Sequence, residues 1–258
     1  MTTSIETKHE GNVVIVTLNR PDKLNALTDE MYIRMTELFT GFQTDDKVRA
    51  VIVTGAGRAF CAGSDVTTMV NTNLVEGRSR MQTRHAMVNA LANLEKPVIA
   101  AVRGAAVGIG FSLAMACDLI IASDNAKFSQ IFKKIGLIPD GGSIFFLVQR
   151  IGVVRAKELV YTARMLPAEE AREWGIINRV VPDAELESNA LRLAQEIAGS
   201  ATFALALAKK MFQSMYTPNL EAHLEQENLC QAIAKLTDDH LEGVAAFKEK
   251  RAAVFKGR

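Results

Sequence analysis

The sequence predicts an α/β protein with mostly parallel strands, followed by a helical C-terminal part. Up to Val153, short β-branched runs alternate with stretches of helical periodicity, the order that parallel strands joined by helices produce. After Val153, nearly every stretch favours helix. With 258 residues and a hydrophobic content of 48%, the chain can bury a sizeable core.

The predicted strands are β-branched runs bounded by loops. Residues 12–18 form the first and are closed by Asn19, Arg20 and Pro21, which lead into a loop. The other predicted strands are residues 49–54, 97–102 and 118–122, with a single later strand at 176–181.

The predicted helices follow a 3.6-residue apolar spacing. Thr28, Asp29 and Glu30 open the first of them, because a threonine followed by acidic residues is a common helix start. The others are 81–94, 110–117, 143–149, 155–162, 168–174, 184–197, 201–215, 220–236 and 240–254. A soft boundary near Gly199 divides a core of residues 1–199 from a helical region of residues 200–258. The apolar faces of the late helices need burial, and a subunit interface is one candidate.

Composition excludes several classes of function. A net charge of +1 gives no electrostatic footprint for nucleic acid or an anionic membrane. Three cysteines, far apart and in no CxxC pair, argue against a disulfide framework or zinc site and suit a reducing cytoplasm. The polar N-terminus lacks the apolar core of a signal peptide, and no apolar stretch is long enough to span a bilayer. We therefore expect a cytoplasmic protein with a small-molecule substrate and no metal.

Two glycine-containing stretches carry most of the chemistry. Residues 60–65 (FCAGSD) and 104–110 (GAAVGIG) each follow a predicted buried strand. Small residues there let a ligand atom reach main-chain N–H groups. We place two such donors at Ser64 and Ile109, the second at a helix start, where they would stabilise negative charge on a carbonyl oxygen as an oxyanion hole.

Two other interpretations of the glycines remain. They could simply permit tight turns. Residues 108–110 could also belong to a dinucleotide-binding motif, but Leu113 stands where its third glycine should be and no acidic residue follows at the usual distance. The dinucleotide interpretation is therefore weak.

Asp140 is the most informative acid. It lies in residues 138–142 (IPDGG), between an apolar run and a helical segment, where an aspartate often makes a turn or caps a helix. In an apolar pocket its pKa would rise, which suits a general base working near neutrality. Asp65 follows a glycine turn and is assigned to capping. His85 lies in a predicted helix, where a lone histidine is usually structural or exposed.

These residues resemble the crotonase superfamily, the enoyl-CoA hydratases and isomerases. The resemblance covers essentially the whole chain, in order. The matching segments are 18–21 (LNRP) with 24–27 (LNAL), 60–65, 96–104, Phe128 with 136–142, and Glu242–Gly243 with Phe247 and Lys250–Arg251.

The resemblance implies a spiral of ββα units, a helical trimerisation region and often a dimer of trimers. It also implies an acyl-CoA thioester substrate, whose carbonyl is held by the N–H groups of Ser64 and Ile109, and no tightly bound cofactor. By the same resemblance, CoA would lie along Lys23, Ala26 and Ala62, and would be reached by Phe247 and Lys250 of a neighbouring subunit.

The resemblance also bears on the reaction. Hydratases of this family use two glutamates, and here Ser112 and Phe132 occupy their positions. The remaining acid, Asp140, is placed like the aspartate of family members that isomerise double bonds. One base suffices for a 1,3-proton shift from C2 to C4 of a 3-enoyl-CoA, so an enoyl-CoA isomerase is our leading hypothesis.

Three alternatives stay open. One is an enoyl-CoA hydratase. Another is a dehalogenase of the 4-chlorobenzoyl-CoA type, with Asp140 as nucleophile and His85 as base, although Phe132 replaces the tryptophan of those enzymes. The last is a scaffold that binds CoA thioesters without turning them over. Residues 67–84 are expected to form a loop that shapes the acyl pocket.

Overall fold

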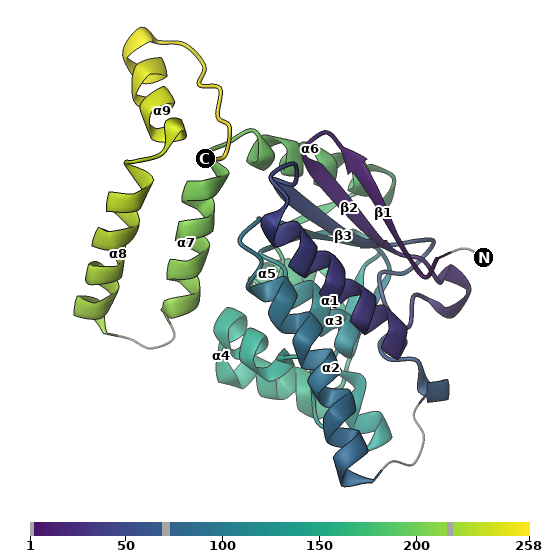
Figure 1. The fold of residues 1–258 in the computed structure, drawn as a ribbon. Helices are drawn as coiled ribbons and strands as arrows, with labels where there is room; N and C mark the ends of the chain where they lie inside the picture. The colour runs from purple at the N-terminus through teal and green to yellow at the C-terminus, as the bar shows by residue number, and fades with distance from the viewer. Residues whose placement is uncertain (1–2, 69–72, 216–218) are drawn as a thin grey trace.

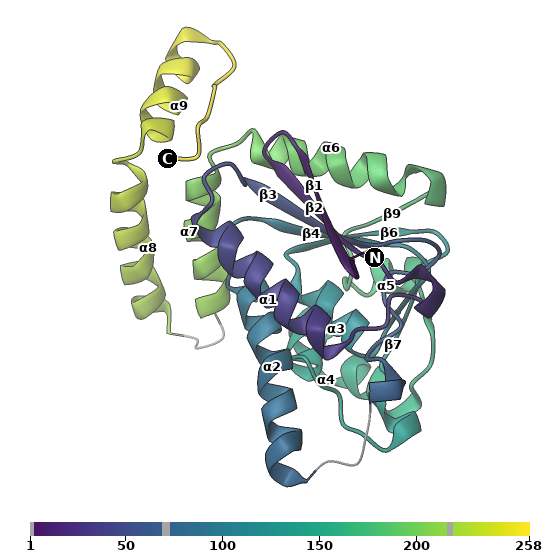
Figure 2. The same cartoon turned by 45° about the vertical axis from the view of Figure 1, so that its right-hand side comes forward.

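A computed structural model describes residues 3–68, 73–215 and 219–258. Its main sheet has six strands in the order β1-β2-β3-β4-β6-β9 (Figures 1 and 2). Their bounds are Ile5–Glu10, Val13–Leu18, Ala50–Gly55, Val98–Val102, Leu119–Ser123 and Arg179–Val181. Only the β1–β2 pair of this sheet is antiparallel. The predicted mostly parallel sheet is confirmed.

A second sheet of three short strands lies beside the first. It has the order β5-β7-β8, with bounds Ala105–Val107, Lys127–Ser129 and Leu166–Pro167. The chain thus passes from β4 through β5 into a helix, and from β6 through β7 toward the next one, as expected for a spiral of ββα units. The sequence analysis missed β1 and these three short strands.

The described part of the chain has nine α-helices. They are α1 (Asp29–Thr44), α2 (Leu74–Ala92), α3 (Ile109–Ala116), α4 (Ser143–Thr162), α5 (Ala168–Glu173), α6 (Leu186–Ala198), α7 (Thr202–Ser214), α8 (Leu220–Ala234) and α9 (Asp238–Glu249). Short 3-10 turns are η1 (Pro21–Lys23), η2 (Val66–Thr68), η3 (Ile131–Ile135) and η4 (Asp183–Glu185). As predicted, the Thr28 hydroxyl caps α1 by accepting from the Met31 N–H at 3.4 Å.

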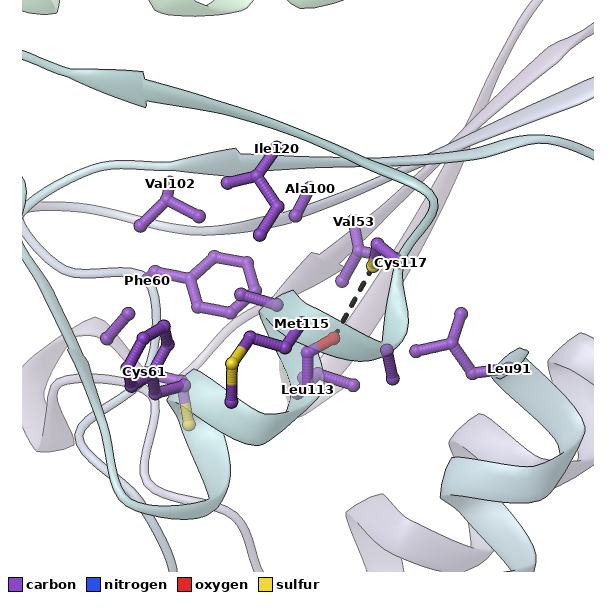
Figure 3. Close-up of a cluster of buried hydrophobic side chains, with 14 of the residues drawn as sticks. Val53, Phe60, Cys61, Leu91, Ala100, Val102, Leu113, Met115, Cys117 and Ile120 are labelled. Carbon is purple, nitrogen blue, oxygen red and sulfur yellow. Dashed lines mark hydrogen bonds between the residues drawn. The ribbon is translucent and has the colours of Figure 1, made fainter. Parts of the chain in front are cut away.

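The strands of the main sheet bury both faces, because their side chains alternate between two apolar clusters. Val51 and Val53 of β3 face α1, α2 and α3, while Ile52 between them faces α6. Figure 3 shows the first cluster, in which Phe60 lies below the sheet and the Cys117 thiol donates to the Leu113 carbonyl. Burial raises the pKa of the Cys61 thiol to about 12, so it stays protonated near neutral pH.

Several predicted boundaries are wrong. The segments 143–149 and 155–162, predicted as two helices, form the single element α4, with non-helical backbone angles at Gly152. Within residues 67–84, a helix rather than a loop begins at Leu74, capped by Asn73; residues 69–72 lie outside the described part. The first half of α2 is mostly exposed, so its sequence has no apolar periodicity that would predict a helix. The last helix ends at Glu249, not Val254, because Lys250 adopts a left-handed conformation (φ 56°).

The helices α7, α8 and α9 project from the body of the molecule (Figures 1 and 2). Arg49, directly before β3, connects the sheet to the segment before α7 and to the C-terminal segment after α9. Its guanidinium donates to the Ser200 carbonyl at 2.6 Å and to the Phe255 carbonyl at 2.9 Å. The described helices include none long and apolar enough to cross a membrane.

Candidate active site

The two glycine stretches meet at the edge of the second sheet. The Cys61 N–H donates to the Ala105 carbonyl, and the Val107 N–H donates to the Cys61 carbonyl, both at 2.9 Å. A Cβ on Gly110 would lie 2.4 Å from the Cys61 carbonyl oxygen. Only a glycine lets the start of α3 pack this closely, so the sequence brings the two loops into one structure.

The Ser64 N–H is left free by the geometry of the isolated parallel β-bridge that Ser64 forms with Leu27. In the parallel bridge with Leu27, the Gly63 carbonyl and the Asp65 N–H make the two hydrogen bonds, at 2.8 and 2.9 Å. The Ser64 N–H therefore points away from Leu27, and it donates to no carbonyl within residues 3–68, 73–215 and 219–258.

The Ile109 N–H also donates to no carbonyl in the described part of the chain, for a different reason. Ile109 is the first residue of α3, where no carbonyl lies one turn back to accept its proton. Gly108 before it has φ 57° and ψ −127°, a conformation that L side chains avoid. Two free N–H groups thus lie on neighbouring loops, one of them at the positive end of a helix dipole.

Asp140 lies against the start of α3. Its own carbonyl accepts from the Ser112 hydroxyl at 2.9 Å, and a Cβ on the adjoining Gly141 would lie 2.1 Å from Ile109 Cδ1. The helix that follows has Gly142 at its N-cap and no side-chain cap. The carboxylate of Asp140 is therefore not used for capping.

The Asp140 carboxylate is instead paired with Arg84 of α2. Arg84 Nη1 lies 3.1 Å from Asp140 Oδ2, and the two side chains are only 13% and 11% exposed. Burial raises the pKa of Asp140 above its ordinary value, opposed by the positive charges of Arg84 and then His85. Asp140 Oδ1 is buried with no hydrogen-bond partner among the described residues.

The two residues beside this acid that sequence reasoning missed are Arg84 and Tyr32. The Arg84 guanidinium lies 5.5 Å from the centroid of the Tyr32 ring, and the Tyr32 hydroxyl lies 2.8 Å from the Ser64 hydroxyl oxygen. No signal in the sequence could have paired Arg84 with Asp140, since 56 residues separate them.

The other candidate acid, Asp65, behaves as a structural group. It accepts from the Thr67 N–H and hydroxyl, as its capping assignment requires, and it also pairs with Arg20 at 2.9 Å. Hydrogen bonds from Thr67 and then Arg20 hold its pKa at about 2. Asp65 is thus a poor proton acceptor near neutral pH, in contrast to Asp140.

By the resemblance, Ser112 and Phe132 stand at the glutamate positions of hydratases, and of the two only Ser112 makes a hydrogen bond to Asp140 in the described part of the chain. Ser112 is fully buried on α3, and the Phe132 ring lies close to Gly108. His85 follows Arg84 on α2 with an exposed side chain.

Three of the residues assigned to CoA share one corner. Lys23 ends η1, its carbonyl accepts from the Ala26 N–H at 3.1 Å, and the Ala62 N–H donates to the Leu24 carbonyl at 2.9 Å. Asn25 fixes this corner, because its buried amide donates to the carbonyls of Ala56 and Ala59.

The other two residues assigned to CoA lie elsewhere. Phe247 is on α9 with 86% of its surface exposed, and Lys250 directly follows the last residue of that helix. α9 projects from the body of the molecule (Figure 1), and no hydrogen bond or ion pair among the described residues joins Phe247 or Lys250 to Lys23, Ala26 or Ala62.

Comparison with known proteins decides the family. Residues 8–258 match the enoyl-CoA hydratase/isomerase family. The chain belongs to this family. It is 40% identical to the 1,2-epoxyphenylacetyl-CoA isomerase of Escherichia coli K12, over 96% of this chain and 97% of that protein. It is 37% identical to the carnitinyl-CoA dehydratase of the same strain, over the full length of both.

Solved structures of the enoyl-CoA hydratase/isomerase family share the fold. The crystal structure of an enoyl-CoA hydratase from Bacillus anthracis superposes with a TM-score of 0.95 at 35% identity, covering 99% of this chain and 100% of that one. The crotonase fold expected from the sequence is therefore confirmed, with its helical C-terminal region.

Proposed function

We propose that the protein is an enoyl-CoA isomerase that moves a double bond from C3 to C2 of an acyl-CoA thioester. The observation that carries this proposal is that the site combines one buried aspartate, Asp140, with two N–H groups that have no acceptor among the described residues. By the resemblance, Ser112 and Phe132 replace the two glutamates of hydratases. The 40% identical relative is named 1,2-epoxyphenylacetyl-CoA isomerase, which supports an isomerisation of a CoA thioester but names an epoxide as the substrate.

The reaction needs one base and one oxyanion hole. The thioester carbonyl accepts hydrogen bonds from the Ser64 and Ile109 N–H groups, which makes the C2 protons more acidic. Asp140 removes a C2 proton, and the electron pair spreads over the enolate and the double bond. The protonated carboxyl then returns the proton to C4, which leaves the double bond at C2. Loss of one oxyanion donor typically costs about a hundred- to a thousandfold in rate.

CoA itself forms part of the substrate, and we assign no tightly bound cofactor. Lys23, Ala26 and Ala62 would contact it within one chain, and Phe247 and Lys250 would do so from a neighbouring subunit. The projecting helices of residues 200–258 expose Leu220 and Leu236 at 73% and 84%, which supports a homotrimer or a dimer of trimers.

A second candidate function is the addition or removal of water. It is favoured by the 37% identity to carnitinyl-CoA dehydratase over the full length of both chains. In that case Asp140 would still form the enolate, but water would enter or leave at C3.

The test is to incubate 3-hexenoyl-CoA and 2-hexenoyl-CoA with the protein and to follow the products by mass spectrometry and chromatography. The proposal predicts interconversion of the isomers, lost in Asp140→Asn and retained in Asp46→Asn, which changes an exposed aspartate in a turn. Addition of water would favour the second candidate instead.

Absence of any product would contradict both candidates. Halogenated aryl-CoA thioesters would then test the dehalogenase alternative, which requires halide release that is lost in His85→Ala and Asp140→Ala. Binding of CoA thioesters with no turnover would favour the alternative of a non-catalytic scaffold.

A further inference from the structure

The Arg84–Asp140 pair differs from three other arginine–carboxylate pairs of this chain, in which both carboxylate oxygens accept a hydrogen bond. In the Arg20–Asp65 pair, Arg20 donates to Oδ2 and Thr67 donates to Oδ1. Arg164 and Glu170 form two parallel hydrogen bonds, at 2.9 and 2.5 Å, and Arg251 and Glu242 do the same at 2.6 and 2.9 Å. Such two-point pairs are frequent and strong for arginine, and they occupy both oxygens of the carboxylate.

Arg84, by contrast, contacts Asp140 through one oxygen only. The Nη1–Oδ2 contact is 3.1 Å, while Asp140 Oδ1 and Arg84 Nε are both buried with no hydrogen-bond partner among the described residues. A buried carboxylate oxygen without a donor is costly to a fold. The arrangement therefore makes a poor structural ion pair, but it leaves one oxygen of the acid free to accept a proton.

The position of Arg84 is itself fixed by a third group. Its guanidinium lies over the Tyr32 ring, at 5.5 Å from the ring centroid, and the Tyr32 hydroxyl lies 2.8 Å from the Ser64 hydroxyl oxygen. These contacts run from Asp140 to the loop that carries one of the free N–H groups. Arg84 thus lies between the proposed base and the proposed oxyanion loop.

We propose that Arg84 is a positioning residue for the reaction: it holds Asp140 by Oδ2, keeps it ionised, and leaves Oδ1 to take the substrate proton. This inference rests on the proposed function of Asp140. Burial of the Asp140 carboxyl acts against Arg84, because burial favours the protonated form and Arg84 favours the ionised form.

The charged and titratable groups that act on Asp140 come from two helices. Arg84 and His85 lie on α2, and Tyr32 lies on α1. Burial raises the pKa of the Tyr32 phenol, so it is neutral near pH 7. Ser112 on α3 contacts only the main-chain carbonyl of Asp140. Arg84 is therefore the group whose removal changes the charge around Asp140 most.

The experiment compares Arg84→Gln, Arg84→Lys and a control, Arg78→Gln, which changes an exposed arginine of the same helix. The pH profile of kcat/KM for 3-hexenoyl-CoA is measured for each. A cation within a few ångströms typically lowers a carboxyl pKa by about 1 to 3 units. We expect the acid limb to move up in pH by about that amount in Arg84→Gln, to return most of the way in Arg84→Lys, and to stay unchanged in Arg78→Gln.

A second measurement is independent of turnover. The Asp140 carboxyl carbon, labelled with ¹³C and identified by its absence in Asp140→Asn, is titrated by NMR in the free protein. We expect the same upward movement in Arg84→Gln. If Arg84→Gln does not fold, Arg84→Lys tests the role of Arg84 instead. Its kcat should fall, while the acid limb of its kcat/KM profile stays near that of wild type.

The outcomes separate the two proposals. Loss of isomerisation in Asp140→Asn, with an unmoved titration and pH profile in Arg84→Gln, would overturn the role of Arg84 alone. Full isomerisation in Asp140→Asn would overturn the proposed function, and with it the role of Arg84 in the reaction.

Discussion

The contact between Gly110 and Cys61 allows the oxyanion hole to be perturbed without touching either donor. A Cβ on Gly110 would lie 2.4 Å from the Cys61 carbonyl oxygen and 2.7 Å from its Cβ, about 1 Å short of the ordinary contact that begins at 3.4 Å. In Gly110→Ala, α3 and the loop of Cys61 must therefore move apart. Since Ile109 precedes Gly110 and Ser64 follows Cys61, the two N–H groups move with them.

The effect on stability is a balance of two terms. Overpacking typically costs about 1–3 kcal/mol, and alanine is favoured over glycine inside a helix by about 1 kcal/mol. The free energy of unfolding should therefore fall by roughly 0–2 kcal/mol. A displacement near 1 Å in a catalytic group can lower a rate about a hundredfold, so kcat/KM should fall far more than stability.

The assay is isomerisation of 3-hexenoyl-CoA, with urea unfolding of the same preparations. The matched control is Gly41→Ala in α1, where an added Cβ meets nothing within 4 Å. It should raise the free energy of unfolding by up to about 1 kcal/mol and leave the rate unchanged. A wild-type rate in Gly110→Ala would refute the reasoning, because it would mean that the two loops need not be held together.

Three further predictions concern charge, the C-terminal helices and assembly. Because the folded pKa of Asp140 is raised, wild type loses stability as pH rises from the ordinary value of 3.8 through the folded value, and Asp140→Asn does not. Because asparagine also removes the charged partner of the buried Arg84, the prediction concerns the change with pH: in thermal melts the stability of Asp140→Asn relative to wild type should be greater at pH 7 than at pH 3, and an equal difference at both pH values would contradict this. Arg49→Ala removes charged hydrogen bonds to Ser200 and Phe255 and should cost about 1.5–3 kcal/mol in urea unfolding, whereas a loss near zero would show that the base of α7 is held by other contacts. Sedimentation should give three or six times the chain mass of 28.1 kDa, and a monomer would contradict the proposed trimer.

The parts of the fold that sequence predicted are those with a local cause. Thr28 caps α1 as its residue type suggests, and the buried strands β3, β4 and β6 are mostly apolar runs. The missed strands lack such a signal. β1 is a mostly exposed edge strand with charged side chains, and β5 lies inside a glycine stretch that was interpreted as a ligand-binding loop.

The candidate site divides in the same way. Asp140 and the glycine stretches could be found because unusual residues stand next to predicted strands and helices. Arg84 and Tyr32 could not, because their contacts with Asp140 and Ser64 exist only after α1 and α2 pack beside the loops. The contacts of Arg49 with Ser200 and Phe255 also join distant parts of the chain, and no local pattern encodes them.

The central claim is that Asp140 and the two N–H groups together form an enolate from an acyl-CoA thioester. Exchange of the C2 protons of 3-hexenoyl-CoA with deuterated water, followed by NMR, tests this most directly. The account predicts rapid exchange with wild type and a loss of about a hundred- to ten-thousandfold in Asp140→Asn, the usual contribution of a general base. Exchange at the wild-type rate in Asp140→Asn would contradict it.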